Sequence, residues 1–135
     1  MDARDLVLQF VDAINRHAAG DIAALLTDDH LFVDSLGAEM RGRARMQKAW
    51  EGYFAMVPDY AIVVNETFSA GSIVLLFGTA AGTYSPDGTL PSQNRWSTPA
   101  AWRAVVTGDR VAVWQVYADN EPIRAIMRKY SGQQA

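Results

Sequence analysis

Asp34 is the residue whose type and position are best suited to chemistry. It stands near the end of the short apolar segment HLFVDS, residues 30–35, directly before a Leu36-Gly37 turn. Alternation along a strand places Asp34 on the same face as Phe32. In an apolar cavity, desolvation raises the pKa of a carboxyl group and makes it a usable general base near neutral pH. On a wet face, an aspartate at this position only starts the turn.

Other polar side chains offer weaker prospects for catalysis. Arg103 could bind an oxyanion or pair with Asp34 if it faces the cavity, although an arginine in such a sheet more often faces solvent or a dimer interface. His30 lies about 13 Å from Asp34 along an extended strand, which is too far for contact. The two histidines lack ligand spacing, and the chain has no cysteine. We therefore expect no metal site and no cofactor.

The bulk composition predicts one globular domain over residues 1–135. The chain is 50% hydrophobic and 20% charged, which is ordinary for a soluble protein long enough to bury a core. Its net charge of −3 argues against nucleic-acid binding. No apolar signal core or membrane-spanning run is present, so we expect a cytoplasmic location and no membrane contact. Four tryptophans, five tyrosines and five phenylalanines favour a lined cavity or a large interface.

Apolar periodicity predicts helices in the first third of the chain and strands in the rest. The predicted helices are residues 6–17, a short one capped by Asp21 that includes Leu25 and Leu26, one with Met46, Trp50 and Phe54 on a single stripe, and a C-terminal one with Pro122 in its first turn. The predicted strands are residues 30–35, 60–70, 73–84, 95–106 and 110–118.

Three helices and a short strand, followed by a meander of long antiparallel strands, predict an α+β fold. Long strands twist, so the sheet should curve around helices that pack on one face, and its concave side should form a pocket that the helices close. The expected lining is Phe10, Ile14, Phe32, Trp50, Phe54, Trp114 and Val116, with Asp34 as the polar spot and Arg103 as a further candidate.

Three stretches, together with this element order, carry a resemblance to a known superfamily. They are NRHAAGDIAALLTDDHLFVDSLGAEMRG, FGTAAGTY and RVAVWQVYADNEPI. The chain resembles the nuclear transport factor 2-like superfamily, and more narrowly it is similar to SnoaL-like and ketosteroid isomerase-like proteins. The resemblance covers nearly the whole chain and implies a cone-shaped fold. It leaves the chemistry open, because the superfamily includes isomerases, dehydratases, epoxide hydrolases, polyketide cyclases and binding modules.

The resemblance to the isomerases implies a role for Asp34 but lacks their other catalytic groups. Asp34 matches the aspartate that shuttles a proton between carbons of the substrate. Phe10 and Ala101 stand where the isomerases have a tyrosine and a protonated aspartate that bind the enolate, and Trp50 replaces a supporting tyrosine. Loss of one such donor typically costs about a hundredfold in rate, so normal steroid isomerase activity is not expected. An indole N–H, that of Trp50 foremost, is a candidate replacement donor.

Two kinds of function remain open. In the first, the protein is a cofactor-free isomerase or lyase in which Asp34 removes a proton from carbon in a small, mostly apolar molecule. In the second, it is a non-catalytic module that binds a hydrophobic ligand or serves for dimerisation. The resemblance to limonene epoxide hydrolases adds no base, because Val116 stands where their last-strand aspartate belongs. A homodimer through the outer face of the sheet is expected in either case.

Overall fold

The computed structural model describes residues 2–132, and within them a helical N-terminal third precedes a set of long strands. The helices are α1 (Ala3–Asn15), α2 (Ala19–Ala24), α3 (Arg43–Met56) and α4 (Glu121–Gly132), with a short 3₁₀ turn, η1, at Ser92–Asn94. The strands are β1 (Leu26–Val33), β2 (Glu39–Arg41), β3 (Ala61–Ala70), β4 (Ile73–Thr83), β5 (Arg95–Thr107) and β6 (Arg110–Ala118). This order confirms the predicted α+β class.

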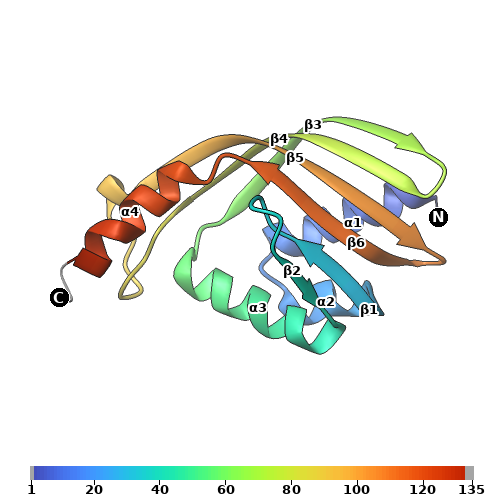
Figure 1. Cartoon of the computed structure of the whole chain (residues 1–135), viewed down its shortest axis with the longest axis horizontal. Coiled ribbons are helices and arrows are strands. Elements are labelled where there is room, and N and C mark those ends of the chain that lie inside the picture. Colours follow the sequence, from blue (N-terminus) through green and yellow to red (C-terminus); the bar gives the residue numbers. More distant parts are fainter. Residues whose placement is uncertain (1, 133–135) are drawn as a thin grey trace.

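The strands of the described residues form one curved sheet in the order β2-β1-β6-β5-β4-β3. The strands β3 to β6 are consecutive antiparallel neighbours, as the alternation of apolar residues predicts. The strand β1 instead joins β6 in parallel, and the short β2, which the periodicity did not predict, pairs with β1 at the edge. Figure 1 shows the long strands arching over α1, α2 and α3, so these helices occupy the concave side.

A bulge in β3 contributes to the bend of the sheet. The register between β3 and β4 shifts between Val64 and Glu66, and an extra residue of this kind increases the local twist. Gly78 of β4 lies beside the bulge, where an added Cβ would come within 1.7 Å of the Val63 carbonyl oxygen. Only glycine allows two backbones to approach so closely, so the position of Gly78 accommodates the bend.

Helix α1 packs an apolar face against the sheet and has distinct signals at both ends. The Asp2 carboxylate caps its start by accepting a hydrogen bond from the Asp5 N–H at 2.8 Å. The chain turns after the helix at His17, which has a left-handed φ of 57° and donates its N–H to the Ile14 carbonyl. Glycine is the usual residue at such a helix end. A histidine there therefore needs side-chain contacts that offset the strain.

The second helix begins and ends earlier than the sequence pattern predicted. Its N-cap is Ala18, and Asp21 lies inside its first turn rather than at the cap. Leu25 follows the helix and Leu26 already begins β1, so the prediction that both belong to the helix was wrong. Leu26 is fully buried and pairs with Val111 of β6. Tertiary burial in the sheet thus overrides the local helical spacing.

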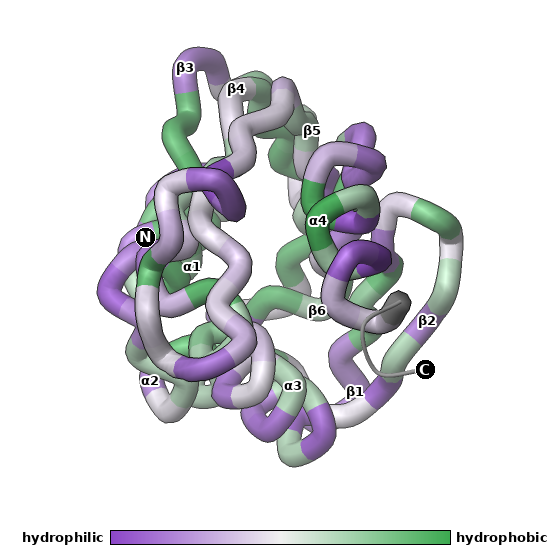
Figure 2. The backbone as a smooth tube through the Cα atoms, turned by 90° about the vertical axis from the view of Figure 1, so that its left-hand side faces the viewer, coloured by the Kyte–Doolittle hydropathy of each residue, from purple (hydrophilic) through white to green (hydrophobic). Residues whose placement is uncertain are grey.

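Helix α3 separates a buried face from a charged one. Met46 and Trp50, four residues apart, are buried, whereas Lys48 and Glu51 are exposed. Figure 2 shows hydrophilic and hydrophobic residues alternating along this helix. It ends just before Pro58, as predicted, because the residue that precedes a proline disfavours helical backbone. Its buried face turns toward the concave side of the sheet, where the helix contacts β1 and β2.

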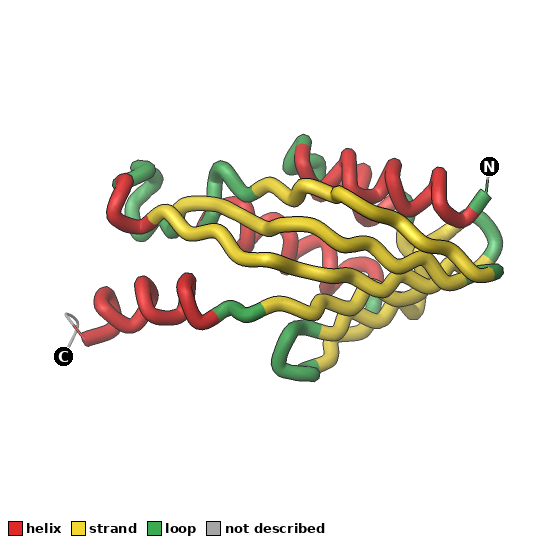
Figure 3. Tube along the Cα trace, turned by 90° about the horizontal axis from the view of Figure 1, so that it is seen from above, coloured by secondary structure: helices red, strands yellow, loops and turns green. Residues whose placement is uncertain are grey.

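The C-terminal helix α4 extends beyond the end of the sheet, where it packs against β5 (Figures 1 and 3). Pro122 lies in its first turn, as predicted. Ile123 and Ile126 are buried against the core. The Asn94 side chain donates a hydrogen bond to the Tyr130 hydroxyl at 2.6 Å, so α4 is tied to the connection between β4 and β5.

Candidate functional site

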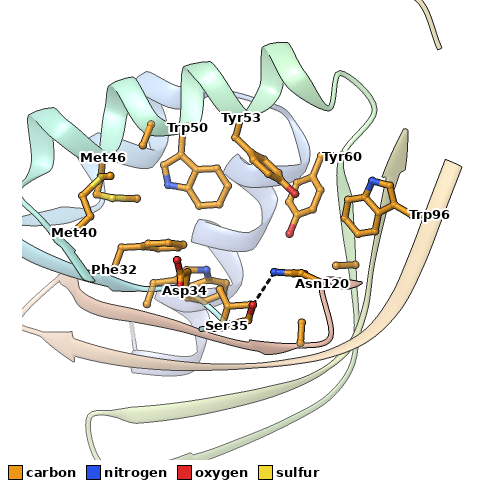
Figure 4. Close-up of a pocket in the computed structure, with 15 residues that line it drawn as sticks. Phe32, Asp34, Ser35, Met40, Met46, Trp50, Tyr53, Tyr60, Trp96 and Asn120 are labelled. Atoms are coloured by element: carbon orange, nitrogen blue, oxygen red, sulfur yellow. Dashed lines mark hydrogen bonds between the residues drawn. The ribbon is translucent and has the colours of Figure 1, made fainter. Parts of the chain in front are cut away.

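A cavity of about 260 Å³ lies between α3 and the concave face of the sheet (Figure 4). Its lining is mostly aromatic and aliphatic with a few convergent polar groups, which is typical of small-molecule sites. The lining residues are Phe32, Asp34, Ser35, Met40, Met46, Ala49, Trp50, Tyr53, Tyr60, Ala80, Trp96, Trp114, Val116, Ala118 and Asn120. In Figure 4, Trp50 and Tyr53 point from α3 into the cavity, across from Asp34, Ser35 and Asn120.

Asp34 lies in this lining, directly after β1, and is half-buried. Its Oδ1 accepts hydrogen bonds from the N–H groups of Leu36 and Ala38, both at 2.9 Å. The Asp34 N–H donates to the Ala38 carbonyl at 2.9 Å, which closes the turn. The described residues supply no hydrogen bond to Oδ2. Asp34 therefore starts the turn with one oxygen, while its Oδ2 has no hydrogen bond from the described residues.

Ser35 and Asn120 form a bridge beside Asp34. The Asn120 side-chain amide donates to the Ser35 hydroxyl oxygen at 2.8 Å, as the dashed line in Figure 4 shows. Ser35 belongs to the turn between β1 and β2, whereas Asn120 stands between β6 and α4. One side-chain hydrogen bond thus connects the turn that carries Asp34 to the end of the strand meander.

Helix α3 lines the cavity with residues at i, i+3, i+4 and i+7, namely Met46, Ala49, Trp50 and Tyr53. Each residue advances about 100° around a helix, so Tyr53 returns to within about 20° of Met46, whereas Phe54 lies about 80° away. Phe54 is therefore outside the lining, contrary to expectation. Its ring stacks on His17 with 4.3 Å between centroids and on Trp50 with 5.4 Å.

Tyr53 and Tyr60 bring two hydroxyl groups to the cavity, and Figure 4 shows both directed into it. Their rings pack edge to face with 4.9 Å between centroids. Burial raises the pKa of both phenols well above the ordinary range, so both remain protonated donors. No described residue accepts a hydrogen bond from either hydroxyl. These two groups can therefore donate to a ligand.

The backbone around Tyr60 is held from α1. The His17 Nε2–H donates to the Tyr60 carbonyl at 2.6 Å. The Asn15 side chain makes two hydrogen bonds with Ile62, accepting from its N–H and donating to its carbonyl, both at 2.9 Å. The contacts of His17 explain why a histidine is tolerated at its strained helix end. Together these bonds fix the start of β3, and with it the position of the Tyr60 ring.

Asp59 anchors the same corner to β4 and β5. Its carboxylate accepts hydrogen bonds from the N–H and the hydroxyl of Thr83, both at 2.7 Å, and from Arg95 at 3.2 Å. Gly82 lies against this segment, where an added Cβ would come within 2.3 Å of the Val57 side chain. The corner that carries Tyr60 is therefore tightly packed as well as hydrogen-bonded.

Trp96 of β5 completes this end of the cavity. The residue is only 5% exposed, and its ring lies 6.2 Å from that of Tyr60 between centroids. Its Nε1 is buried without a hydrogen-bond partner. Most buried polar groups in proteins are paired. Among the described residues, the Thr27 hydroxyl is the one other side-chain group in this state, and Thr27 does not line the cavity.

The sheet side of the cavity includes three residues of the expected lining, Phe32, Trp114 and Val116. Phe10 and Ile14 of α1 are outside the lining, contrary to expectation. Both are fully buried, and the Phe10 ring meets Trp114 edge-on with 4.8 Å between centroids. Because Trp114 lies between α1 and the cavity, these residues support the wall from behind. The ligand-binding role of the lining residues stays a prediction.

Arg103 lies on the opposite face of the sheet from the cavity. Burial alternates along β5, with Trp102 and Ala104 buried on the inner face. Arg103 therefore points to the convex side, where it is flanked by Leu75 and Gln115 on the neighbouring strands. This placement contradicts the expectation that Arg103 could reach Asp34. No lysine, arginine or histidine occurs among the described residues that line the cavity.

His30 is more deeply buried than expected. It is 1% exposed, and its Nδ1–H donates to the Val111 carbonyl of β6 at 2.7 Å. Burial lowers its pKa, although the bond to Val111 opposes this effect. His30 therefore joins β1 to β6 and contributes to the scaffold rather than to the cavity.

Several residues line the cavity although the sequence did not lead us to expect them there. Some of them have a spacing that indicates this position. Tyr53 has helical spacing to Met46, and Tyr60 and Trp96 have even spacing to inward residues of β3 and β5. Asn120 carried no such signal, because only loop geometry brings it to Ser35. No helix of residues 2–132 is long and apolar enough to cross a membrane. The same residues hold no cluster of three or more His, Asp or Glu side chains suited to a metal ion.

Comparison with known proteins identifies the fold. A family model described as the SnoaL-like domain matches residues 7–116. A putative SnoaL-like polyketide cyclase from Shewanella denitrificans superposes with a TM-score of 0.80 at 12% identity, covering 94% of this chain and 97% of that one. No curated protein sequence matches the chain significantly.

Two further solved structures are similar at 20% identity and a TM-score of 0.76. One is a protein with a ketosteroid isomerase-like fold from Catenulispora acidiphila in complex with trimethylamine, with 89% of each chain covered. The other is an LEH-like epoxide hydrolase from M. tuberculosis, with 91% of this chain and 82% of that one covered. At such identities the likeness confirms the expected fold, and the relatives' activities differ too much to indicate a shared chemistry.

Proposed function

Because the chain belongs to the SnoaL-like domain family, we propose that its cavity binds a small, mostly apolar molecule and that Asp34 removes a proton from one of its carbon atoms without a cofactor. The observation that carries this proposal is the placement of Asp34. Of the described lining residues, it alone is charged at neutral pH, and it faces an otherwise aromatic and aliphatic wall. The activity would be that of an isomerase or a lyase.

The geometry of the carboxylate suits a general base. Two backbone N–H groups hold Oδ1, which fixes the orientation of the group while Oδ2 can approach a substrate. In the proposed step the substrate C–H bond breaks, the proton moves to Asp34, and the electron pair delocalises onto an oxygen of the substrate. Return of the proton to another carbon completes an isomerisation, and loss of a leaving group completes an elimination.

The hydroxyls of Tyr53 and Tyr60 supply donors for the negative charge that develops. The isomerases' own donor positions are unsuited here, since Phe10 is apolar and buried behind Trp114. Tyr53 and Tyr60 instead reach the cavity from α3 and from the start of β3. Neutral donors held in place in a dry site stabilise such charge efficiently, because they need no reorganisation during the reaction.

Ring opening of nitrobenzisoxazole tests the base assignment. A base removes the ring C–H proton, the N–O bond breaks, and the coloured phenolate that forms is followed by its absorbance. We expect slow turnover by the natural chain and loss of turnover in Asp34→Asn. Asp29→Asn is the matched control, because Asp29 is an exposed carboxylate of β1, the strand that precedes Asp34. Equal rates for Asp34→Asn and the natural chain would remove Asp34 as the base.

The same assay separates base from donors. Tyr53→Phe and Tyr60→Phe should each slow turnover by about tenfold, less than a full oxyanion hole provides, because the probe delocalises its own charge. A rate that is unaffected by both tyrosine substitutions would limit the machinery to Asp34.

The alternative function is a binding module without turnover. It is favoured by the engagement of Asp34 in its own turn and by the aromatic wall, which suits a hydrophobic ligand or a small alkylammonium ion held over aromatic faces. The Catenulispora acidiphila protein was solved with trimethylamine. Calorimetric titration with tetramethylammonium and with an uncharged isostere of the same shape tests this alternative. Tight binding with no turnover of nitrobenzisoxazole would support it.

We also propose that the chain forms a homodimer through the convex face of the sheet. Large apolar side chains are exposed there, namely Val63, Phe68, Leu75, Phe77 and Tyr117. Such a patch is unusual on a monomer. Sedimentation should give twice the 14.8 kDa of one chain, and Phe77→Lys should shift the mass to that of the monomer. Leu90→Lys, in an exposed position off the sheet, is the control and should remain dimeric.

A further inference from the structure

His17 has a backbone conformation that histidine seldom adopts. Its φ is 57°, and among the described residues it is the one non-glycine residue with a positive φ. Glycine is the usual residue where a helix ends in this conformation. A side chain in the left-handed region strains the backbone, and such strain persists where other contacts enforce it, often at functional sites. The contacts of the His17 ring therefore indicate what this position contributes.

The imidazole holds the backbone of Tyr60. The Tyr60 carbonyl can only accept a hydrogen bond, so the 2.6 Å contact with Nε2 places the proton of the neutral ring on this nitrogen. No other described residue donates to this carbonyl, because Tyr60 precedes β3 and its pairing with β4. The Tyr60 N–H donates to the Val57 carbonyl at 3.1 Å. His17 thus satisfies the backbone group of Tyr60 that would otherwise lack a partner in the described chain.

The same ring supports the side of the cavity that α3 forms. The rings of His17 and Phe54 are nearly parallel, with an interplanar angle of 4° and 4.3 Å between centroids. Phe54 stacks in turn on Trp50 at 5.4 Å. Trp50 and Tyr60 line the cavity, whereas His17 and Phe54 do not. His17 therefore stands behind two lining residues and reaches a bound molecule only through them.

Glycine at position 17 would relieve the strain but would remove both contacts. Donors stabilise developing charge only when they are held in place before the reaction. We infer that His17 is a positioning residue, which holds the Tyr60 phenol toward the cavity through its hydrogen bond to the Tyr60 carbonyl. The inference rests on the proposed function, in which that phenol is a donor.

Turnover of nitrobenzisoxazole by three variants tests this role. His17→Gly relieves the strain and removes both contacts, His17→Phe keeps a flat ring without a donor, and His17→Gln keeps an N–H group without the ring. We expect kcat to fall about three- to tenfold in the first two and less in His17→Gln, with little change in KM, because a displaced donor acts on the transition state. Full kcat in His17→Gly and His17→Phe, or a raised KM alone, would overturn the inference.

A double-mutant cycle shows whether His17 acts through Tyr60. In the Tyr60→Phe background the hydroxyl group is gone, so His17→Gly should cause no further fall in kcat. A further fall of the full size would refute the positioning role. Arg16→Ala is the matched control, because Arg16 is exposed at the same helix end, where it pairs with Asp12 and Asp21. It should keep kcat, and a loss equal to that of His17→Gly would assign the effect to the helix end as a whole and refute the inference.

The outcome is separable from that of the proposed proton transfer. Unchanged turnover in Asp34→Asn would remove the proposed base, and the role of His17 would fall with it. Loss of turnover in Asp34→Asn and slower turnover in Tyr60→Phe, with full kcat in His17→Gly and His17→Phe, would refute the role of His17 alone.

Nuclear magnetic resonance of the natural chain tests the hydrogen bond without any substitution. The nitrogen-15 signals of the neutral His17 ring should show the proton on Nε2, and this proton should be protected from exchange with solvent. A proton on Nδ1 would exclude the bond to the Tyr60 carbonyl. That result would overturn the inference even if the His17 variants fold poorly.

Discussion

The two ends of the cavity are held in different ways. At one end, Asp34 sits on a turn that is closed mainly by its own backbone, and Leu36 at its tip is 74% exposed. The bridge between Ser35 and Asn120 is the side-chain hydrogen bond that joins this turn to the strand meander. At the other end, Tyr60 belongs to a packed corner. Hydrogen bonds from the end of α1 and from β4 fix this corner in place.

The difference separates the carboxylate of the proposed site from its proposed donors. The carboxylate lies on an exposed turn, whereas the two phenols lie on the packed scaffold. Donors that meet developing charge are effective only when their positions are fixed beforehand. Substitutions at the scaffold end should therefore cost stability, and those at the turn should alter ligand exchange.

A pair of glycine substitutions gives the largest contrast. Gly82→Ala should destabilise the fold by about 2–3 kcal/mol, because its Cβ would overlap the buried side chain of Val57. Gly37→Ala should cost only about 1 kcal/mol, because its surroundings are open and only its φ of 85° opposes a side chain. Urea unfolding measures both values. Equal costs would mean that the scaffold end is no more tightly packed than the turn.

The two hydrogen bonds between Asn15 of α1 and Ile62 of β3 should give the next largest effect on stability. Asn15→Ala removes both hydrogen bonds to the Ile62 backbone and should destabilise the fold by about 1–2 kcal/mol. It should also slow turnover of nitrobenzisoxazole, since Tyr60 lies two residues from Ile62. Asn65 is an exposed residue of β3, the strand that contains Ile62, and Asn65→Ala should keep the free energy of unfolding within about 0.5 kcal/mol of the natural chain. Unaltered stability in Asn15→Ala would show that packing alone holds this corner.

The bridge at the turn should contribute less to stability. A double-mutant cycle with Ser35→Ala and Asn120→Ala should give a coupling of about 0.5–1 kcal/mol, the usual value for one neutral hydrogen bond. Its effect on ligand exchange should be clearer, with faster association and dissociation of a fluorescent hydrophobic ligand in stopped-flow measurements. Slower exchange without the bridge would indicate that the turn is not the route of entry.

Acidification should lower the stability of the fold through His30 of β1, the strand that leads to the Asp34 turn. This is the smallest of the four expected effects. Burial lowers the pKa of His30 below its ordinary value of 6.5 in the folded chain. As the pH falls through about 6.5, the unfolded chain takes up a proton that the folded chain resists, so stability declines. The contribution of the buried, neutral His30 to stability is therefore fully present above this pH range. Melting temperatures between pH 8 and 5.5 should fall less steeply in His30→Gln, and an equal slope would exclude His30 as the source.

The periodicity of apolar residues predicted the order of the helices and strands. It did not predict those boundaries that depend on pairing with a strand elsewhere in the chain. The long strands β3 to β6 alternate strictly enough to be recognised without any partner. Leu26 illustrates the opposite case, since its place in β1 depends on Val111 at the other end of the chain. The edge strand β2 has only three residues, which is too short for a periodic signal.

The site was predictable where local geometry decides it. Asp34 and Phe32 alternate on one strand, and both line the cavity. The stripe on α3 was read four residues at a time, which led to Phe54 in place of Tyr53, although a turn of 3.6 residues favours the latter. Arg103 has the opposite parity to the buried Trp96 and Trp102 of β5, so alternation along this strand favours the convex face for it. The meeting of Ser35 and Asn120 has no local signal at all.

The parallel pairing of β1 with β6 makes the last strand a condition for the cavity. Phe32 pairs with Trp114, so the sheet side of the cavity joins an early segment to a late one. Pairings that distant in sequence form slowly, because the chain between them must first be ordered. During synthesis, the apolar faces of β1 and α3 therefore lack the β6 side of the cavity until β6 has left the ribosome. A ligand can act on folding only at the final step, by trapping the finished sheet rather than by guiding its assembly.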